Sequence, residues 1–158
     1  MKIYIGEDHA GYKLKEKLIE YLLDFNYEVA DKGAFSFNLD DDYIDFVKHV
    51  AESVVEEGGS FGIVIGGSGQ GEAMCANRIK GVRCAVYYGK TGTQTDTSGN
   101  TLDIIASTRM HNNANVLSLG ARFITEDEAK KVIKEFLETE FSGEERHVRR
   151  IKKLDLTQ

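Results

Sequence analysis

Two patterns of apolar residues alternate along this chain. Short continuous apolar runs predict buried strands, whereas apolar residues that recur every three or four positions predict amphipathic helices. On this basis the sequence predicts strands at about residues 2–6, 27–30, 61–65, 82–88 and 115–119. It predicts helices at about 14–25, 43–55, 72 onwards, 102–110, 125–139 and 144 onwards.

The alternation of strands and helices predicts an α/β fold. Right-handed crossovers between successive strands build a mainly parallel, doubly wound sheet, which binds ligands beyond the carboxyl ends of its strands. A chain of 158 residues fits one compact domain, so we expect a single domain over 1–158. Functional residues are therefore expected in the loops that follow the strands.

Residues 89–101 interrupt this regular alternation. The stretch is rich in Thr, Gly and Ser, has almost no apolar residue, and is long for a simple connection. We expect it to be either a mobile lid or a disordered insert.

Charge and cysteine content narrow the possible functions. A net charge of -6 argues against sequence-independent binding of nucleic acid, which needs clustered cations. Cys75 and Cys84 do not form spaced pairs, and no stretch is typical of a signal peptide or a membrane span. We expect reduced thiols, a cytoplasmic location and no membrane partner.

The glycine loop at positions 66–71 follows a predicted buried strand, and its backbone N–H groups could converge on an anion. It matches neither the dinucleotide pattern nor the nucleotide P-loop, because Glu72 stands where each motif needs another residue. A carboxylate at a helix N-terminus suits a base that removes a proton next to a carbonyl group. The alternative is that Glu72 only complements the helix dipole.

Other polar residues flank further predicted strands. Asp8 and His9 directly follow the first strand, where they could bind hydroxyl or phosphate groups, or merely cap a helix. His111 precedes the last strand and could exchange protons near neutral pH, or belong to a surface turn. The four histidines lack the spacing of metal ligands, so no metal site is expected.

Arg146 and Arg150 lie four residues apart on the last predicted helix, so both guanidinium groups share one face. This face could bind a phosphate group through forked contacts, or could be a basic end of an acidic protein. Cys75 lies one turn into its predicted helix and is interpreted as a small buried thiol.

Taken in order, the motifs of the chain resemble ribose-5-phosphate isomerase type B and the galactose-6-phosphate isomerase subunits. They are GEDHAGY at 6–12 followed by LK, GIVIGGSGQGE at 62–72, ANR at 76–78 with GVR at 81–83, HNNANV at 111–116 with GAR at 120–122, and RH at 146–147 with Arg150. The resemblance covers nearly the whole chain. The insert at 89–101 departs from typical members and leaves the carbon number of the sugar open.

The resemblance implies a Rossmann-like three-layer sandwich with a five-stranded, mainly parallel sheet. It implies a homodimer or dimer of dimers with active sites at the subunit interface. The implied reaction is aldose–ketose isomerisation of ribose 5-phosphate and ribulose 5-phosphate through a cis-enediol, with no metal and no cofactor. An isomerase of a six-carbon sugar phosphate, of the allose- or galactose-6-phosphate type, and a non-catalytic sugar-phosphate sensor remain alternatives.

The resemblance also implies roles for individual residues in moving protons. Many family members have a catalytic cysteine where this chain has Gly66, and they lack the glutamate; this chain resembles the branch in which Glu72 is the base. Ser68 would assist at the reacting oxygens, and His111 with Asp8 would open the furanose ring. The backbone amides of the glycine loop would stabilise the enediolate, including those of Gly67, Gly69 and Gly71.

Substrate binding would fall to a second group of residues. The resemblance gives Asn112 a contact with a sugar oxygen. It assigns the phosphate group to His9, Arg122, Arg146 and Arg150, with both subunits contributing.

Overall fold

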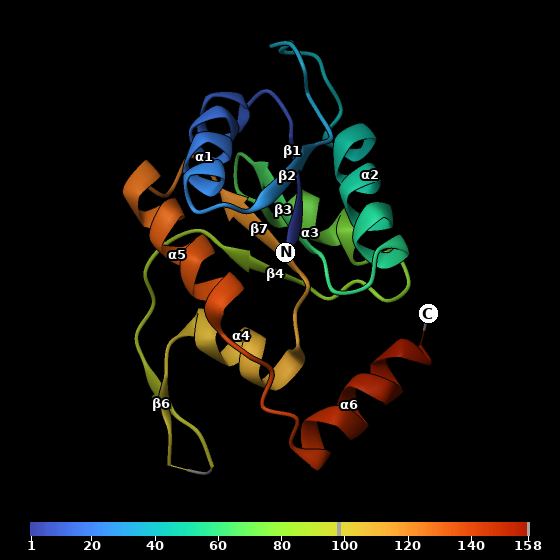
Figure 1. Cartoon of the computed structure of the whole chain (residues 1–158), viewed down its shortest axis with the longest axis vertical. Helices are drawn as coiled ribbons and strands as arrows, with labels where there is room; N and C mark the ends of the chain where they lie inside the picture. The colour runs from blue at the N-terminus through green and yellow to red at the C-terminus, as the bar shows by residue number, and fades with distance from the viewer. Residues whose placement is uncertain (98, 158) are drawn as a thin grey trace.

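The computed structural model describes residues 1–97 and 99–157 (Figure 1). Its strands are β1 (Lys2–Glu7), β2 (Glu28–Asp31), β3 (Phe61–Gly66), β4 (Cys84–Tyr87), β5 (Gln94–Thr95), β6 (Thr101–Leu102) and β7 (Val116–Gly120). Its helices are α1 (Tyr12–Asp24), α2 (Tyr43–Glu56), α3 (Gln70–Ala76), α4 (Ile104–Asn112), α5 (Glu126–Glu138) and α6 (Glu145–Asp155).

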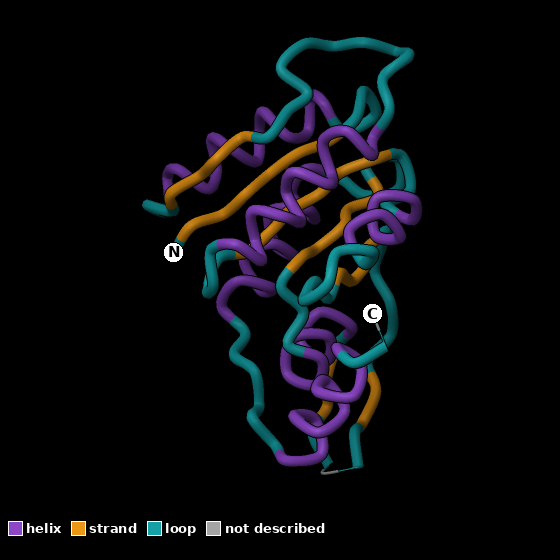
Figure 2. Tube along the Cα trace, turned by 90° about the vertical axis from the view of Figure 1, so that its right-hand side faces the viewer, coloured by secondary structure: helices purple, strands orange, loops and turns teal. Residues whose placement is uncertain are grey.

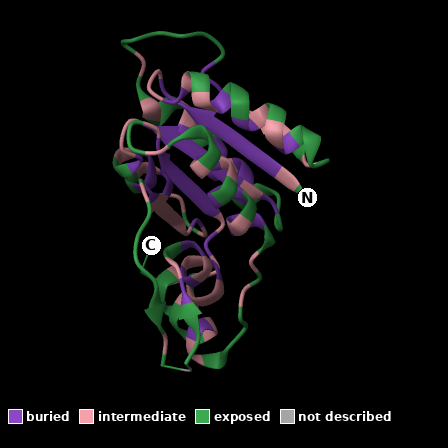
Figure 3. Cartoon of the chain, turned by 90° about the vertical axis from the view of Figure 1, so that its left-hand side faces the viewer, coloured by how far each residue is buried: buried purple, intermediate pink, exposed green. Residues whose placement is uncertain are grey.

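Five strands form one parallel sheet in the order β2-β1-β3-β7-β4. Residues of α1 and α5 pack on one face of it, and residues of α2 pack with the other (Figures 1 and 2). The three central strands are almost wholly buried (Figure 3), as their continuous apolar runs require. The predicted Rossmann-like three-layer sandwich is confirmed.

A buried charge network fixes the end of β1. The Lys15 ammonium lies 3.1 Å from Glu7 Oε2, and it donates hydrogen bonds of 2.9 Å to Asp31 and 2.8 Å to the carbonyl of Ala34. Burial raises the pKa of Glu7 to about 8, although the positive charge of Lys15 opposes this shift. The network joins β1, β2 and α1 directly beneath the loop that carries Asp8.

The predicted insert at 89–101 differs from expectation. Gln94–Thr95 and Thr101–Leu102 pair as antiparallel strands, so the described part forms a short hairpin instead of a disordered stretch. Its role as a mobile lid stays a prediction, and residue 98 lies outside the described residues. Asp96 stabilises the turn, since it accepts hydrogen bonds from the backbone and side chain of Asn100 at 2.9 and 3.1 Å. These polar turn contacts replace the apolar anchors that the sequence lacks.

Smaller differences concern the ends of elements. Helix α3 begins at Gln70 instead of residue 72, because Gly69 at its N-cap adopts a left-handed conformation with φ of 75°. Helix α4 begins at Ile104, where Asp103 accepts hydrogen bonds from the amides of Ile105 and Ala106. Among the described residues, the helices are too short or too polar to cross a bilayer.

Candidate active site

A cavity of about 370 Å³ lies at the carboxyl ends of the central strands. Loops after β1, β3 and β7 all reach it, as expected for ligand sites in parallel sheets. Seven of the sequence-predicted site residues line this cavity: Asp8, His9, Gly67, Ser68, Gly71, Glu72 and Arg122. Sequence reasoning did not single out Tyr43 and Phe123, which also line it.

Glu72 lies in the first turn of α3, and only 4 % of its surface is exposed. Burial raises the pKa of its carboxyl group, and the negative charge of Asp8 adds to the effect. A carboxylate with a raised pKa is a stronger base, while the open cavity still gives it access to a ligand. This geometry fits a proton-transferring group.

Gly66 makes room for that carboxylate. A β-carbon built on Gly66 would collide with the carboxylate carbon and oxygens of Glu72. Gly66 also pairs with Gly120 at the end of the sheet, so its backbone cannot simply withdraw. A side chain at position 66 and the observed placement of Glu72 therefore exclude each other.

The rest of the glycine loop is held in place by β7. The hydroxyl of Ser118 donates a 2.6 Å hydrogen bond to the carbonyl of Gly69, and the amide of Arg122 donates one of 3.1 Å to the carbonyl of Gly67. Any side chain at Gly67 would approach the Arg122 guanidinium at 3.3 Å. The loop and the arginine therefore form one compact wall of the cavity.

His9 has a partner that sequence reasoning missed. Its Nδ1 lies 2.8 Å from Asp41 Oδ1 and 4.0 Å from Asp8 Oδ2, and its backbone amide also donates to Asp41. Asp41 belongs to a polar loop before α2, and its only signal in the sequence is a run of three aspartates. The ligand atoms of Asp8, His9 and Asp41 lie within 4.8 Å of one another, so the absence of a metal site stays a prediction.

Apart from Gly69, which caps α3 within the glycine loop, the other predicted site residues lie away from this cavity. His111 and Asn112 end α4, where His111 stacks on His147 of α6 at 4.5 Å between ring centroids. Asn112 and Arg150 line a separate cavity of about 390 Å³. Arg146 contacts Glu144 at 2.8 Å and also Thr97 of the insert.

These two groups lie beyond opposite ends of the strands of the sheet. Strands β3 and β7 run parallel in register, with Gly62 opposite Val116 and Gly66 opposite Gly120. Glu72 follows the carboxyl end of β3, whereas His111 precedes the amino end of β7, and five strand residues span about 16 Å. His111 and Asp8 therefore lie apart within one chain, and their joint action at a subunit interface stays a prediction.

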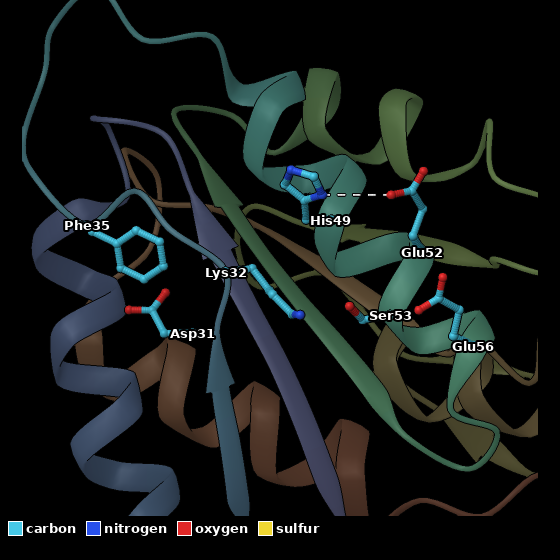
Figure 4. A pocket seen from close by; sticks show the side chains of 7 residues that line it. All are labelled: Asp31, Lys32, Phe35, His49, Glu52, Ser53 and Glu56. Carbon is cyan, nitrogen blue, oxygen red and sulfur yellow. Dashed lines mark ion pairs between the residues drawn. The ribbon is translucent and has the colours of Figure 1, made fainter.

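Another hollow, between β2 and α2, contains none of the predicted site residues. It is lined by Asp31, Lys32, Phe35, His49, Glu52, Ser53 and Glu56 (Figure 4). His49 and Glu52 pair with each other at 3.8 Å across one turn of α2. The described residues offer no convergent donors there comparable to the glycine loop.

Comparison with known proteins agrees with this geometry. Residues 3–154 match the Ribose/Galactose Isomerase family. The chain is 40% identical over 151 residues to ribose-5-phosphate isomerase B of Mycobacterium tuberculosis, which covers 96% of this chain and 86% of that protein. Among solved structures, ribose-5-phosphate isomerase B from Mycoplasma genitalium with bound ribulose 5-phosphate has a TM-score of 0.87 and 37% identity, covering 99% of this chain and 95% of that one.

A second solved structure gives the same result. The ribose 5-phosphate isomerase of Thermotoga maritima has a TM-score of 0.85 and 39% identity, covering 98% of this chain and 97% of that one. Sequence and structure agree over almost the full length of each protein. The chain belongs to the Ribose/Galactose Isomerase family.

Proposed function

We propose that this protein interconverts ribose 5-phosphate and ribulose 5-phosphate through a cis-enediol, without a metal. The observation that carries the proposal is the buried Glu72 carboxylate beside the glycine loop, in a cavity that also holds Arg122. The solved relative from Mycoplasma genitalium, which has ribulose 5-phosphate bound, supports this choice of substrate.

Glu72 is the base in this proposal. It takes the proton from C2 of the open-chain aldose, and the electron pair of that C–H bond forms the C1–C2 double bond while O1 gains negative charge. The amides of Gly67, Gly69 and Gly71, with the hydroxyl of Ser68, stabilise that oxyanion. The proton on O2 then passes to O1, and Glu72 returns its proton to C1 as the C2–O2 carbonyl forms. The product is the ketose, and no net proton is consumed.

The phosphate group needs cations on the other side of the sugar. Arg122 lies in the Glu72 cavity, while Arg146 and Arg150 lie on α6. A planar guanidinium can make two parallel hydrogen bonds to phosphate oxygens. His9 donates from Nδ1 to Asp41, and its protonated ring would donate a further hydrogen bond from Nε2 to the phosphate.

These residues do not meet within one chain, because they lie beyond opposite ends of the strands of its sheet. A symmetric dimer brings them together if the carboxyl end of the strands, with Glu72, in one copy faces the amino end, with His111, in the other. The proposal therefore includes an active site shared by two subunits. In it, Asp8, Ser68, Glu72 and Arg122 come from one copy, and His111, Asn112, Arg146 and Arg150 from its partner.

Mixing two inactive variants tests the shared site. Glu72→Gln and His111→Ala proteins are each expected to be nearly inactive. When co-refolded, heterodimers contain one site with both wild-type residues, so activity recovers to about one quarter of wild type for random pairing of subunits. Absence of recovery, with heterodimers demonstrated by mass spectrometry, would show that each site lies within one chain.

A substrate panel tests the reaction itself. With a metal chelator present, we expect the purified protein to convert ribose 5-phosphate and to turn over unphosphorylated ribose at least 100-fold less efficiently, because charge-assisted contacts to the phosphate are lost. Preferential turnover of a six-carbon aldose phosphate would change the substrate and keep the reaction. Binding of sugar phosphates without turnover would indicate a sensor, and loss of activity with the chelator would overturn metal independence.

A further inference from the structure

The insert contributes an acidic side chain to the His111 region. Asp96 follows β5, and Asp96 Oδ2 lies 3.6 Å from His111 Nε2. The Asp96 side chain is only 6% exposed and that of His111 20%. A carboxylate this close to an imidazole, and this well shielded from water, interacts strongly with it.

Among residues 1–97 and 99–157, Asp96 is the one carboxylate that forms an ion-pair contact with His111. His111 Nδ1 lies 3.4 Å from the Ser107 hydroxyl, a long contact, and one ring face stacks on His147. Burial lowers the pKa of His147, with smaller contributions from His111 and Arg146, which favours its neutral form. Arg146, also on α6, is anchored to Glu144 and to Thr97 of the insert.

We propose that Asp96 is the positioning residue for His111 and that the insert is thereby part of the catalytic apparatus. This inference rests on the proposed function, in which His111 opens the furanose ring. The 3.6 Å separation of Asp96 Oδ2 and His111 Nε2 is longer than a hydrogen bond, so Asp96 acts on His111 through its negative charge. This charge favours an N–H on Nε2 and leaves Nδ1 as the proton acceptor. Asp96 also stabilises the imidazolium that forms when Nδ1 takes a proton.

Ring opening of the furanose moves one proton off O1 and one proton onto O4. The proton of the O1 hydroxyl passes to His111 Nδ1, and the C1–O1 carbonyl forms. The C1–O4 bond breaks with its electron pair moving to O4, which is protonated through Asp8 of the partner copy's cavity or by water. The product is the open-chain aldehyde on which Glu72 acts.

A substrate that cannot form a ring separates this role from proton transfer at carbon. The 4-deoxy analogue of ribose 5-phosphate lacks the hydroxyl that closes the furanose, so it is always an open-chain aldehyde. We expect Asp96→Asn to lower kcat for ribose 5-phosphate by roughly 10- to 100-fold, the scale of a weakened acid–base residue. Turnover of the 4-deoxy analogue should change less than about threefold, because it needs no ring opening.

Asn100→Ala is the matched control. It removes a hydrogen bond from the same turn but leaves the Asp96 carboxylate next to His111. We expect near-wild-type turnover of both substrates, and Asp96→Glu should restore part of the activity lost in Asp96→Asn.

Three results would overturn the inference. They are unchanged ribose 5-phosphate turnover in Asp96→Asn, equal losses on both substrates, and equal losses in Asp96→Asn and Asn100→Ala. Failure of the proposed function looks different, because the wild-type protein itself would then convert no sugar phosphate.

Discussion

Replacing Glu72 with glutamine is expected to lower isomerase turnover by roughly 10²- to 10⁴-fold while substrate binding persists. The amide keeps the shape of the side chain and fits the same space beside Gly66, but it cannot accept the C2 proton. Turnover measured with ribose 5-phosphate and affinity measured by calorimetry separate the two effects. Glu16→Gln, an exposed change on α1, is the control and should leave both unchanged.

The pH profile gives a second check on Glu72. Its pKa is raised above the ordinary value of 4.5, and the base must be ionised to act. The rate should therefore fall as pH drops through a value above 4.5, the acid limb of kcat/KM.

A Glu72→Gln variant that retains a tenth of wild-type turnover would remove Glu72 from the role of base.

Adding a single methyl group at position 66 is expected to lower isomerase turnover nearly as much as Glu72→Gln does. Gly66→Ala places a β-carbon where the Glu72 carboxylate lies, so the carboxylate must move. Displacing a catalytic group by about 1 Å can cost on the order of 100-fold in rate. We expect a loss of this size in kcat, measured with the same assay.

Gly58→Ala separates this effect from the general cost of replacing a glycine. A β-carbon at Gly58 would meet no atom within 4 Å, so its activity and melting temperature should match those of wild type. Gly66→Ala must also fold, as shown by circular dichroism, for its rate to be interpreted. Half or more of wild-type turnover in folded Gly66→Ala would mean that the position of Glu72 is not critical.

The collision between a side chain at position 66 and the Glu72 carboxylate also bears on which residue acts as the base in this loop. A cysteine at position 66 needs the space that the Glu72 carboxylate occupies. The loop can therefore hold a cysteine at position 66 or the Glu72 carboxylate, but not both. The family resemblance implied a choice between these two groups, which stays a prediction, and the collision gives a physical reason for it.

Much of the fold was predictable from the sequence because its signals are local. Short apolar runs predicted all five strands of the main sheet. The runs are most continuous in β1, β3 and β7, because these three strands are buried on both faces. Periodic apolar residues identified the helices, and alternation of the two predicted the parallel crossovers. The glycine loop and Glu72 were identified because they lie next to each other in the chain.

Three features depended on the tertiary structure, because they join residues far apart in sequence. Asp41 reaches His9 across 32 positions, and no local pattern pairs them. The short hairpin of the insert forms through turn hydrogen bonds and places Asp96 against His111, whereas its composition predicted only a mobile lid or a disordered insert. The register of β3 with β7 separates Glu72 from His111, which sequence order alone could not determine. Sequence therefore specified the elements and the residue types of the site, and only packing of the sheet decided which of these residues one chain can bring together.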